Sequence, residues 1–140
     1  MKIVINSCYG GFGLSMQAVR EYLKLKGKEA FFYQQIGYSF EGNESYGRID
    51  NINTDGYLMF YTFTQDFGKT VSKLPEDGWF WDNDIERTDR DLVSVVEKLG
   101  EKADGNHAKL SFVDIPDDVK WVISEYDGIE TVEEEHRSWN

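Results

Sequence analysis

A segment near the start of the chain combines a thiol, three glycines and a hydroxyl in a pattern suited to holding an anion. Residues 6–15 read Asn-Ser-Cys-Tyr-Gly-Gly-Phe-Gly-Leu-Ser. Gly10, Gly11 and Gly13 lack Cβ atoms, so the backbone can turn sharply and bring its N–H groups close to a ligand. A helix starting after Ser15 adds partial positive charge at its N-terminus. The segment therefore predicts a loop that binds a phosphate or a carboxylate.

The glycine pattern matches neither common nucleotide-binding fingerprint. The dinucleotide fingerprint needs a third glycine where this chain has Met16, and the next predicted strand ends in Gln34 and Gln35 rather than in an acid. A P-loop is excluded because no Gly-Lys-Ser or Gly-Lys-Thr occurs. Two interpretations stay open. We favour anion binding, and the alternative is a tight turn that needs glycine for backbone reasons alone.

Side chains elsewhere could complete such a site. Arg87 could clamp a phosphate, although a single arginine beside acids more often forms a surface ion pair. At the end of the chain a histidine, an arginine and a tryptophan could contact and stack on a nucleotide, or the tryptophan could pack on a sheet. The predicted ligand-binding residues are Cys8, Tyr9, Gly10, Gly11, Phe12, Gly13, Leu14, Ser15, Arg87, His136, Arg137 and Trp139.

Catalysis is the competing interpretation of these residues. Cys8 could be a nucleophile because a thiol near glycine amides and a helix N-terminus can have a lowered pKa. Its partner would be His107 or His136, but their spacing gives no support for a Cys-His pair, and a small buried cysteine after a strand is commoner. Carboxylates near a predicted turn, at Glu125, Asp127 and Glu130, could instead serve in cleaving an N-glycosidic or phosphate bond.

Metal and cofactor chemistry have little support in the sequence. The chain has one cysteine and two histidines far apart, which excludes a multi-cysteine metal site and argues against zinc. Magnesium bound by carboxylates beside a phosphate stays open. We predict no cofactor.

Composition fits a single domain over residues 1–140 with a real hydrophobic core, because hydrophobic residues make up 40% and aromatic residues 15% of the chain. A single cysteine excludes an intrachain disulfide and suggests a reducing compartment. We find no signal segment and no run long enough to span a membrane. The expected location is therefore the cytoplasm.

The net charge of −11, from 26 acids and 15 bases, repels polyanions, so we expect no sequence-specific nucleic-acid binding. A small phosphorylated ligand is compatible with this charge, because local donors can overcome a distant field that salt screens. The acidity could instead serve to occupy a basic protein. Lysines interleaved with the acids favour ordinary solubility.

The elements around the glycine loop predict strand, helix and strand. Residues 2–5 are apolar on both faces, which is typical of a strand covered on both sides, as in parallel sheets. Ser15 can cap a helix that stops near Gly27, and residues 30–33 suit a strand. Together they predict a right-handed βαβ unit.

Turn signals divide the middle of the chain. Residues 37–47 read as an irregular connection or a lid, and residues 48–52 and 57–63 as a hairpin around an Asp-Gly turn. The Trp-Phe-Trp cluster at 79–81 is either a core plug, which we favour, or a stacking wall for a planar ligand.

The last third predicts a helix over residues 92–99, capped by Thr88 or Asp89, and then strands. Asp127-Gly128 suits a hairpin turn, after which residues 129–136 could return as a strand or as a helix. The expected class is α/β, with α+β as the alternative: an N-terminal βαβ unit, a mixed sheet, two main helices and β-hairpins.

Two blocks resemble a family of small, largely uncharacterised phage and prophage proteins. They are the opening Ile-Asn-Ser-Cys-Tyr-Gly-Gly-Phe-Gly-Leu-Ser, and the closing Ile-Pro-Asp-Asp-Val-Lys-Trp with Tyr-Asp-Gly-Ile-Glu and His-Arg-Ser-Trp. The resemblance also covers the helix at 92–99, whereas the aromatic middle looks individual to this chain. A phage setting implies one idea by analogy, a sponge that binds host nucleotide immune signals without cleaving them.

The leading hypothesis is a protein that sequesters a small nucleotide-like anion, with Gly10, Gly11 and Gly13 contacting phosphate. The alternatives are a nucleotide-processing enzyme, either a hydrolase or a glycosidic-bond transferase, and an acidic inhibitor that binds a protein. The chain could also form a homo-oligomer if its aromatic middle is exposed.

Overall fold

The computed structural model describes residues 1–38, 44–52 and 59–135, and these ranges contain two α-helices and nine strands. This content agrees with the predicted α/β or α+β class. The elements in chain order are β1 (Lys2–Asn6), α1 (Met16–Leu25), β2 (Phe31–Tyr38), β3 (Glu44–Ile49), β4 (Tyr61–Phe63), β5 (Thr70–Val71), β6 (Trp79–Phe80), the 3-10 helix η1 (Asp82–Asp84), α2 (Arg90–Leu99), the 3-10 helix η2 (Gly100–Ala103), β7 (Leu110–Asp114), β8 (Trp121–Tyr126) and β9 (Ile129–Glu134).

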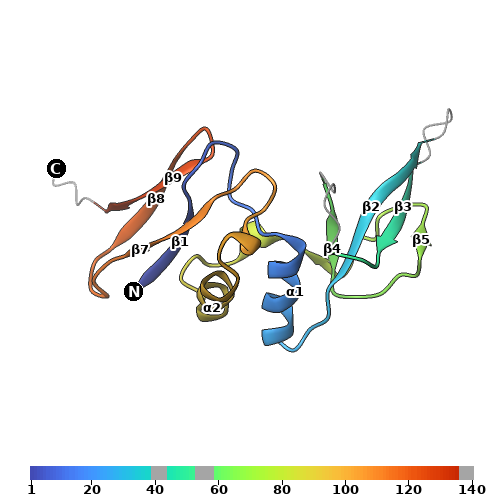
Figure 1. Ribbon diagram of the computed structural model, residues 1–140, viewed down its shortest axis with the longest axis horizontal. Helices are drawn as coiled ribbons and strands as arrows, with labels where there is room; N and C mark the ends of the chain where they lie inside the picture. Colours follow the sequence, from blue (N-terminus) through green and yellow to red (C-terminus); the bar gives the residue numbers. More distant parts are fainter. Residues whose placement is uncertain (39–43, 53–58, 136–140) are drawn as a thin grey trace.

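The strands gather at the two ends of an elongated molecule, with the two helices between them (Figure 1). At one end β1 pairs with β7 and β8 pairs with β9. At the other end five strands form a sheet in the order β5-β3-β2-β4-β6. Each of the described strand pairs is antiparallel.

The predicted right-handed βαβ unit does not form. The order strand, helix, strand is as predicted, but β1 and β2 belong to different sheets. β1 is covered on both sides, as predicted: Ile3, Val4 and Ile5 are all buried, and both α2 and β9 contact the strand. An apolar strand needs covering on both faces, and a helix with a hairpin supplies that cover here without any parallel neighbour.

Both helices have the predicted caps. The side chain of Ser15 accepts a hydrogen bond from the N–H of Ala18 at the start of α1, and Gly27 follows the helix with a φ of 75°. Asp89 caps α2 by accepting from the backbone of Asp91. A side-chain acceptor satisfies helix N–H groups that have no intrahelical partner, which fixes where each helix begins.

One hydrophobic cluster runs from β1 through both helices to the five-stranded sheet. It joins Val4, the buried face of α1, Leu92 of α2 and Phe32 of β2. A second cluster contains Tyr33, which points to the opposite face of β2 because side chains alternate along a strand. Its other buried members are Tyr46 and Phe63.

One predicted hairpin and one predicted connection differ from the expectation. The described parts of the hairpin, residues 48–52 and 59–63, do not pair, because β3 lies beside β2 and β5, whereas β4 lies beside β2 and β6. The predicted turn at 53–56 falls outside the described residues. The connection expected at 37–47 is shorter, since its two flanks belong to β2 and β3, and the lid proposed there falls partly outside the described residues. The open question at 129–136 is answered up to residue 134, where β9 is a strand.

Candidate functional site

The glycine loop that follows β1 packs backbone to backbone against the turn between β8 and β9. The N–H of Gly10 donates to the carbonyl of Asp127 over 3.2 Å. Gly128 is buried against the loop, and a Cβ added to it would clash with the backbone nitrogens of Gly10 and Gly11. Only glycine permits such an approach, and Gly128 also has a φ of 89° that side chains disfavour.

A second turn closes on the other side of the loop. A Cβ at Gly10 would clash with the carbonyl oxygen of His107, and the N–H of Gly105 donates to the carbonyl of Gly13 over 2.9 Å. Gly10 is therefore needed for close backbone packing, which was the alternative to anion binding in the sequence-based interpretation. Gly11 differs, because a Cβ added there would have no atom within 4 Å, so this position faces open space.

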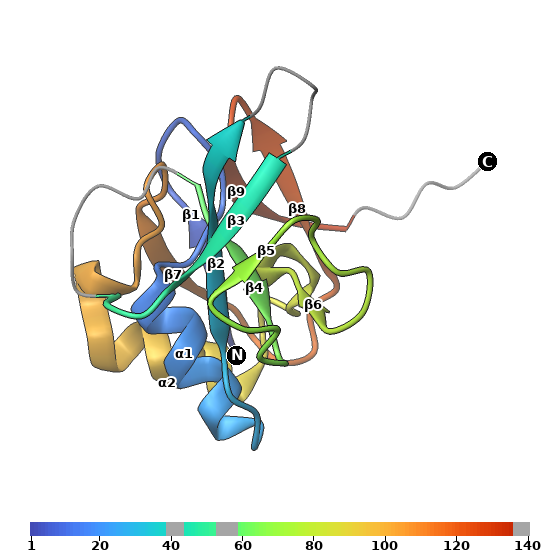
Figure 2. The same cartoon turned by 90° about the vertical axis from the view of Figure 1, so that its right-hand side faces the viewer.

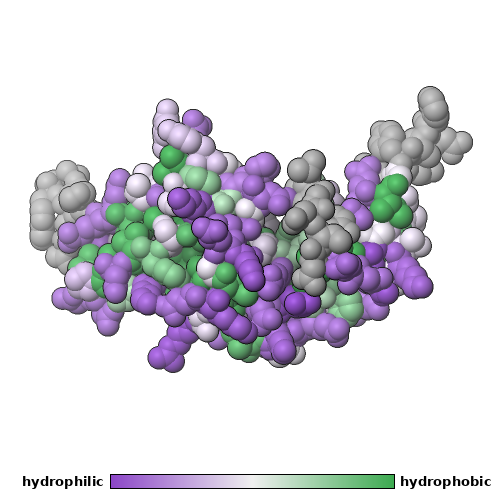
Figure 3. All heavy atoms as spheres, viewed as in Figure 1, coloured by the Kyte–Doolittle hydropathy of each residue, from purple (hydrophilic) through white to green (hydrophobic). Residues whose placement is uncertain are grey.

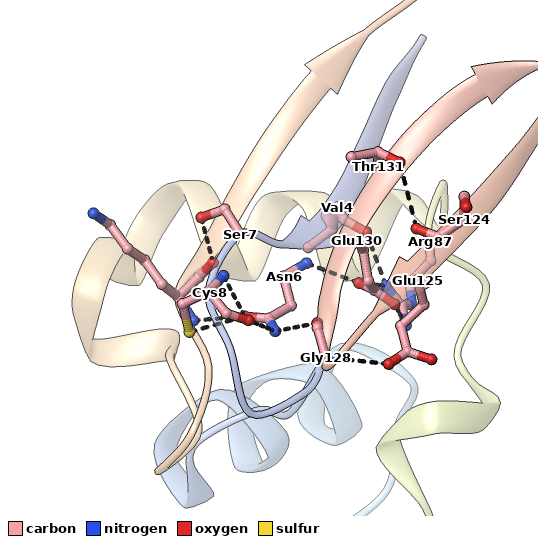
Figure 4. A network of polar contacts seen from close by, with 11 residues as sticks. Val4, Asn6, Ser7, Cys8, Arg87, Ser124, Glu125, Gly128, Glu130 and Thr131 are labelled. Carbon is pink, nitrogen blue, oxygen red and sulfur yellow. Dashed lines mark hydrogen bonds and ion pairs between the residues drawn. The ribbon is translucent and has the colours of Figure 1, made fainter.

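Asn6, at the end of β1, ties the loop to both turns (Figure 4). It is fully buried, and its Nδ2 donates to the carbonyls of Cys8 and Gly128 over 2.7 and 2.6 Å. Its Oδ1 accepts from the N–H of Lys109 over 2.8 Å. One amide side chain thus satisfies three separate backbone segments, which buried polar groups require.

Arg87 reaches the loop but is already paired. Its Nη1 and Nη2 donate to the two carboxylate oxygens of Glu130 over 2.6 and 2.8 Å, in the two-pronged geometry that arginine favours. The Arg87 and Glu130 side chains are only 14% and 9% exposed. The guanidinium also lies 3.5 Å above the centre of the Phe12 ring. Arg87 therefore lies beside the loop, which the sequence could not establish, and it forms a buried ion pair that the sequence did not suggest.

The loop N–H groups fall into two sets. Five already have protein acceptors, namely Ser7, Cys8, Gly10, Leu14 and Ser15. Of those without an acceptor within the described part of the chain, three are consecutive, namely Gly11, Phe12 and Gly13. Neighbouring backbone donors of this kind are the usual means by which a loop binds an anion.

A carboxylate already occupies the helix end of the loop. Oδ2 of Asp82 accepts from the N–H of Leu14 over 2.9 Å. Burial raises the pKa of the Asp82 carboxyl above its ordinary value, although hydrogen bonds from backbone N–H groups, Leu14 first, oppose the rise. The contacts of Asp82, Asn6 and Glu130 were not predicted, because their partners lie far away along the chain.

Two tyrosines stand exposed around the loop. Tyr9 precedes Gly10 and is 69% exposed, and Tyr126 precedes the turn that packs on the loop and is 74% exposed. Phe12 is half-buried under the Arg87 guanidinium. The loop and the turn packed on it therefore present exposed aromatic side chains close in sequence to the loop N–H groups that have no described acceptor.

The predicted catalytic groups are engaged elsewhere. The Sγ of Cys8 contacts Oδ1 of Asn6 over 3.4 Å and the carbonyl oxygen of His107, rather than its imidazole, over 3.5 Å. The Glu125 carboxylate accepts from the N–H of Gly128 over 2.7 Å. Among the described residues, no three His, Cys, Asp or Glu side chains are placed to hold a metal ion.

The structure thus gathers all predicted site residues that it describes. Those brought together are Cys8, Tyr9, Gly10, Gly11, Phe12, Gly13, Leu14, Ser15 and Arg87. The other three, His136, Arg137 and Trp139, lie outside the described residues.

Comparison of the chain with protein families, curated proteins and solved structures found no match. Within the described ranges, no helix has the length and apolar character needed to cross a membrane.

Proposed function

We propose that this protein binds a small nucleotide-like anion at the loop that follows β1, without transforming it. The observation that carries the proposal is the row of N–H groups at Gly11, Phe12 and Gly13, which have no acceptor in the described chain. Such a row can donate to the oxygens of one phosphate.

The surroundings of this row act on an anion in opposite ways. The Asp82 carboxylate accepts from the adjacent N–H of Leu14, and its negative charge repels a second anion nearby. The Arg87 guanidinium over Phe12 places positive charge beneath the loop, although Glu130 offsets much of it. The phosphate would therefore be held mainly by backbone donors.

Exposed Tyr9 supplies a ring on which a base could stack, next to Gly11, where the backbone faces open space. The resemblance to phage proteins extends the proposal to a sponge that sequesters a host nucleotide signal. Sequestration requires tight binding and release of the ligand unchanged.

Thermal shift with ADP-ribose derivatives, cyclic nucleotides and mononucleotides tests this function. We expect at least one of them to raise the melting temperature, and chromatography after heat denaturation to recover it intact. Tyr9→Ser should abolish the shift without lowering the stability of the unliganded protein, because this ring is exposed. Leu25→Ser is the matched control, since Leu25 is 54% exposed at the far end of α1.

Other outcomes would replace the proposal. A chemically altered ligand would make the protein a nucleotide-processing enzyme. An equal loss of the shift in both variants would place the ligand away from the loop, and no shift with any compound would mean that the free N–H groups bind no nucleotide.

The Arg87–Glu130 pair favours a second candidate, an acidic protein that binds a protein partner. Phosphate sites usually present a cation, and here the cation nearest the loop is neutralised by Glu130. In this case the N–H groups of Gly11 to Gly13 are simply hydrated, and no nucleotide changes the melting temperature.

A further inference from the structure

Two exposed tryptophans stand on one side of the chain at β6, in the five-stranded sheet. Asp82, the residue after Trp81, accepts from the N–H of Leu14 in the glycine loop. Trp79 is 47% exposed and Trp81 is 54% exposed. Phe80 between them packs inward, with its ring 6.0 Å from that of Tyr22 in the main core cluster. Of the three aromatic residues 79–81, only Phe80 therefore packs into the core, and the indoles of Trp79 and Trp81 face solvent.

The position of the Trp79 ring is fixed by its neighbours. Its ring lies 5.2 Å from Phe63 in an edge-on contact and 5.7 Å from Tyr61. β6 is the last strand of its sheet, beside β4, so no described strand covers it on the outer side (Figure 2). A large aromatic ring that is already held rigidly loses little conformational entropy when a partner binds it.

The chain around the two indoles is acidic. Residues 74–86 contain no lysine, arginine or histidine. Glu76, Asp77 and Asp84 are exposed and have no ion-pair partner in the described structure. Indole faces attract ammonium and guanidinium groups, and nearby carboxylates strengthen that attraction.

We propose that Trp79 and Trp81, with Glu76, Asp77 and Asp84, form a docking surface for an arginine- or lysine-rich segment of a partner protein. Charge selects this occupant, because a second copy of the chain would bring the same carboxylates against these and a nucleic acid would be repelled. The proposal is independent of ligand binding at the glycine loop, which uses none of these residues.

Fluorescence anisotropy with a labelled peptide of alternating arginine and serine tests the docking surface on the full chain. We expect Trp81→Ala to weaken binding by about threefold to tenfold, the range of a cation–π contact. Trp81 has no described ring contact, so this change should leave the fold intact. Tyr126→Ala is the matched control, since Tyr126 is an exposed aromatic residue of the distant hairpin.

Two triple variants distinguish a specific peptide-binding site from general electrostatic attraction between the acidic protein and the basic peptide. Glu76→Gln, Asp77→Asn and Asp84→Asn together remove three exposed negative charges close to the indoles in sequence, and Glu133→Gln, Glu134→Gln and Glu135→Gln remove three exposed ones at the hairpin. We expect only the first triple to weaken binding strongly. Equal weakening by both, no effect of Trp81→Ala, or no peptide binding would overturn the proposal. A dimer that Trp81→Ala dissociates would assign the surface to self-association instead.

Discussion

Arg87 and Glu130 take the place of a neighbouring strand along the edge of β1 that faces away from β7. The carbonyl of Arg87 accepts from the N–H of Val4 over 2.9 Å, and Oε1 of Glu130 accepts from the N–H of Asn6 over 2.8 Å. Nη1 of Arg87 also donates to the carbonyl of Val4 over 3.3 Å. Buried strand edges need such partners because unpaired backbone groups are costly.

The first prediction concerns this ion pair. Glu130→Gln keeps an oxygen that can accept from Asn6 but leaves the Arg87 guanidinium buried without its counter-charge. We expect the free energy of unfolding to fall by about 3 kcal/mol, because breaking a buried pair strands the remaining charge. Urea denaturation followed by circular dichroism measures this change.

Two further variants make that result specific. Arg87→Met combined with Glu130→Gln should recover much of the loss, because it leaves no buried charge. Asp50→Asn removes a partner of Arg48 that is 67% exposed, and it should cost no more than about 1 kcal/mol. A loss for Asp50→Asn as large as that for Glu130→Gln would contradict the assigned role of burial.

The second prediction concerns the pH dependence of stability through Asp82. Burial raises the pKa of this carboxyl in the folded protein above the ordinary value of 3.8. At pH values between the ordinary pKa of 3.8 and the raised pKa in the folded protein, Asp82 is protonated more in the folded protein than in the unfolded chain. Its contribution to stability therefore rises as the pH falls.

Asp82→Asn keeps an oxygen for the N–H of Leu14 and removes the titration. We therefore expect the wild-type protein to gain stability relative to this variant as the pH is lowered from neutral towards the ordinary carboxyl value. Parallel urea denaturation series across that range provide the measurement. A wild-type protein that loses stability relative to the variant on acidification would show that the pKa is lowered instead.

At the scale of elements, the turn between β8 and β9 holds the glycine loop in place. Gly128 donates its N–H to Glu125, accepts from Asn6 through its carbonyl, and lies against the backbone of Gly10 and Gly11. One turn residue thus connects the closing hairpin to the loop that follows β1. Segments from the opening and the closing parts of the sequence therefore meet at this contact.

The third prediction replaces Gly128 with alanine. The new methyl group would clash with the loop backbone, so we expect a loss of about 3 kcal/mol or more together with disruption of the loop. Gly68→Ala is the matched control, because Gly68 has a similar φ of 96° but open space around it, and it should cost about 1 kcal/mol. Equal losses measured by thermal unfolding would mean that backbone strain, rather than contact with the loop, decides the effect.

Local patterns predicted the elements better than their partners. Ser15 and Asp89 cap the two helices as predicted, and the Asp-Gly turn after Tyr126 is a hairpin turn, because caps and turns depend on adjacent residues. Strand pairing depends on residues far apart along the chain. The apolar run at residues 2–5 therefore predicted a buried strand but suggested a parallel neighbour, whereas β7 is antiparallel.

The candidate site shows the same division. The sequence predicted that the glycine segment is a loop before a helix. It also indicated Arg87 as a ligand-binding residue, and Arg87 does contact Phe12 of that loop. It could not show that Glu130 neutralises Arg87, nor that Asp82 accepts from Leu14, because both contacts depend on how distant elements pack. The glycines were predicted to bind a ligand, but Gly10 and Gly13 make close backbone contacts with the turns at residues 105–108 and 127–128.

At the scale of the whole molecule, hydrophilic residues cover much of the elongated surface, and green apolar patches appear towards the β1, β7, β8 and β9 end (Figure 3). Beneath this surface one cluster connects the two ends, since Val4 of β1 and Phe32 of β2 belong to it. The second cluster, around Phe63, belongs to the five-stranded sheet alone. Unfolding of the two ends should therefore be coupled through the first cluster, whereas the second cluster should stabilise only the five-stranded sheet.

The fourth prediction follows from this arrangement. Leu92→Ala removes a fully buried side chain from the shared cluster and should cost about 2 to 5 kcal/mol. Because that cluster contacts both ends, hydrogen-exchange protection should fall in β1 and in β2 alike. Phe63→Ala should cost a similar amount but lower protection mainly in β2 and β4, because its cluster does not include β1. Loss of protection confined to one end in Leu92→Ala would mean that the ends fold independently, and the glycine loop and the Trp79 surface would then be carried by separate units.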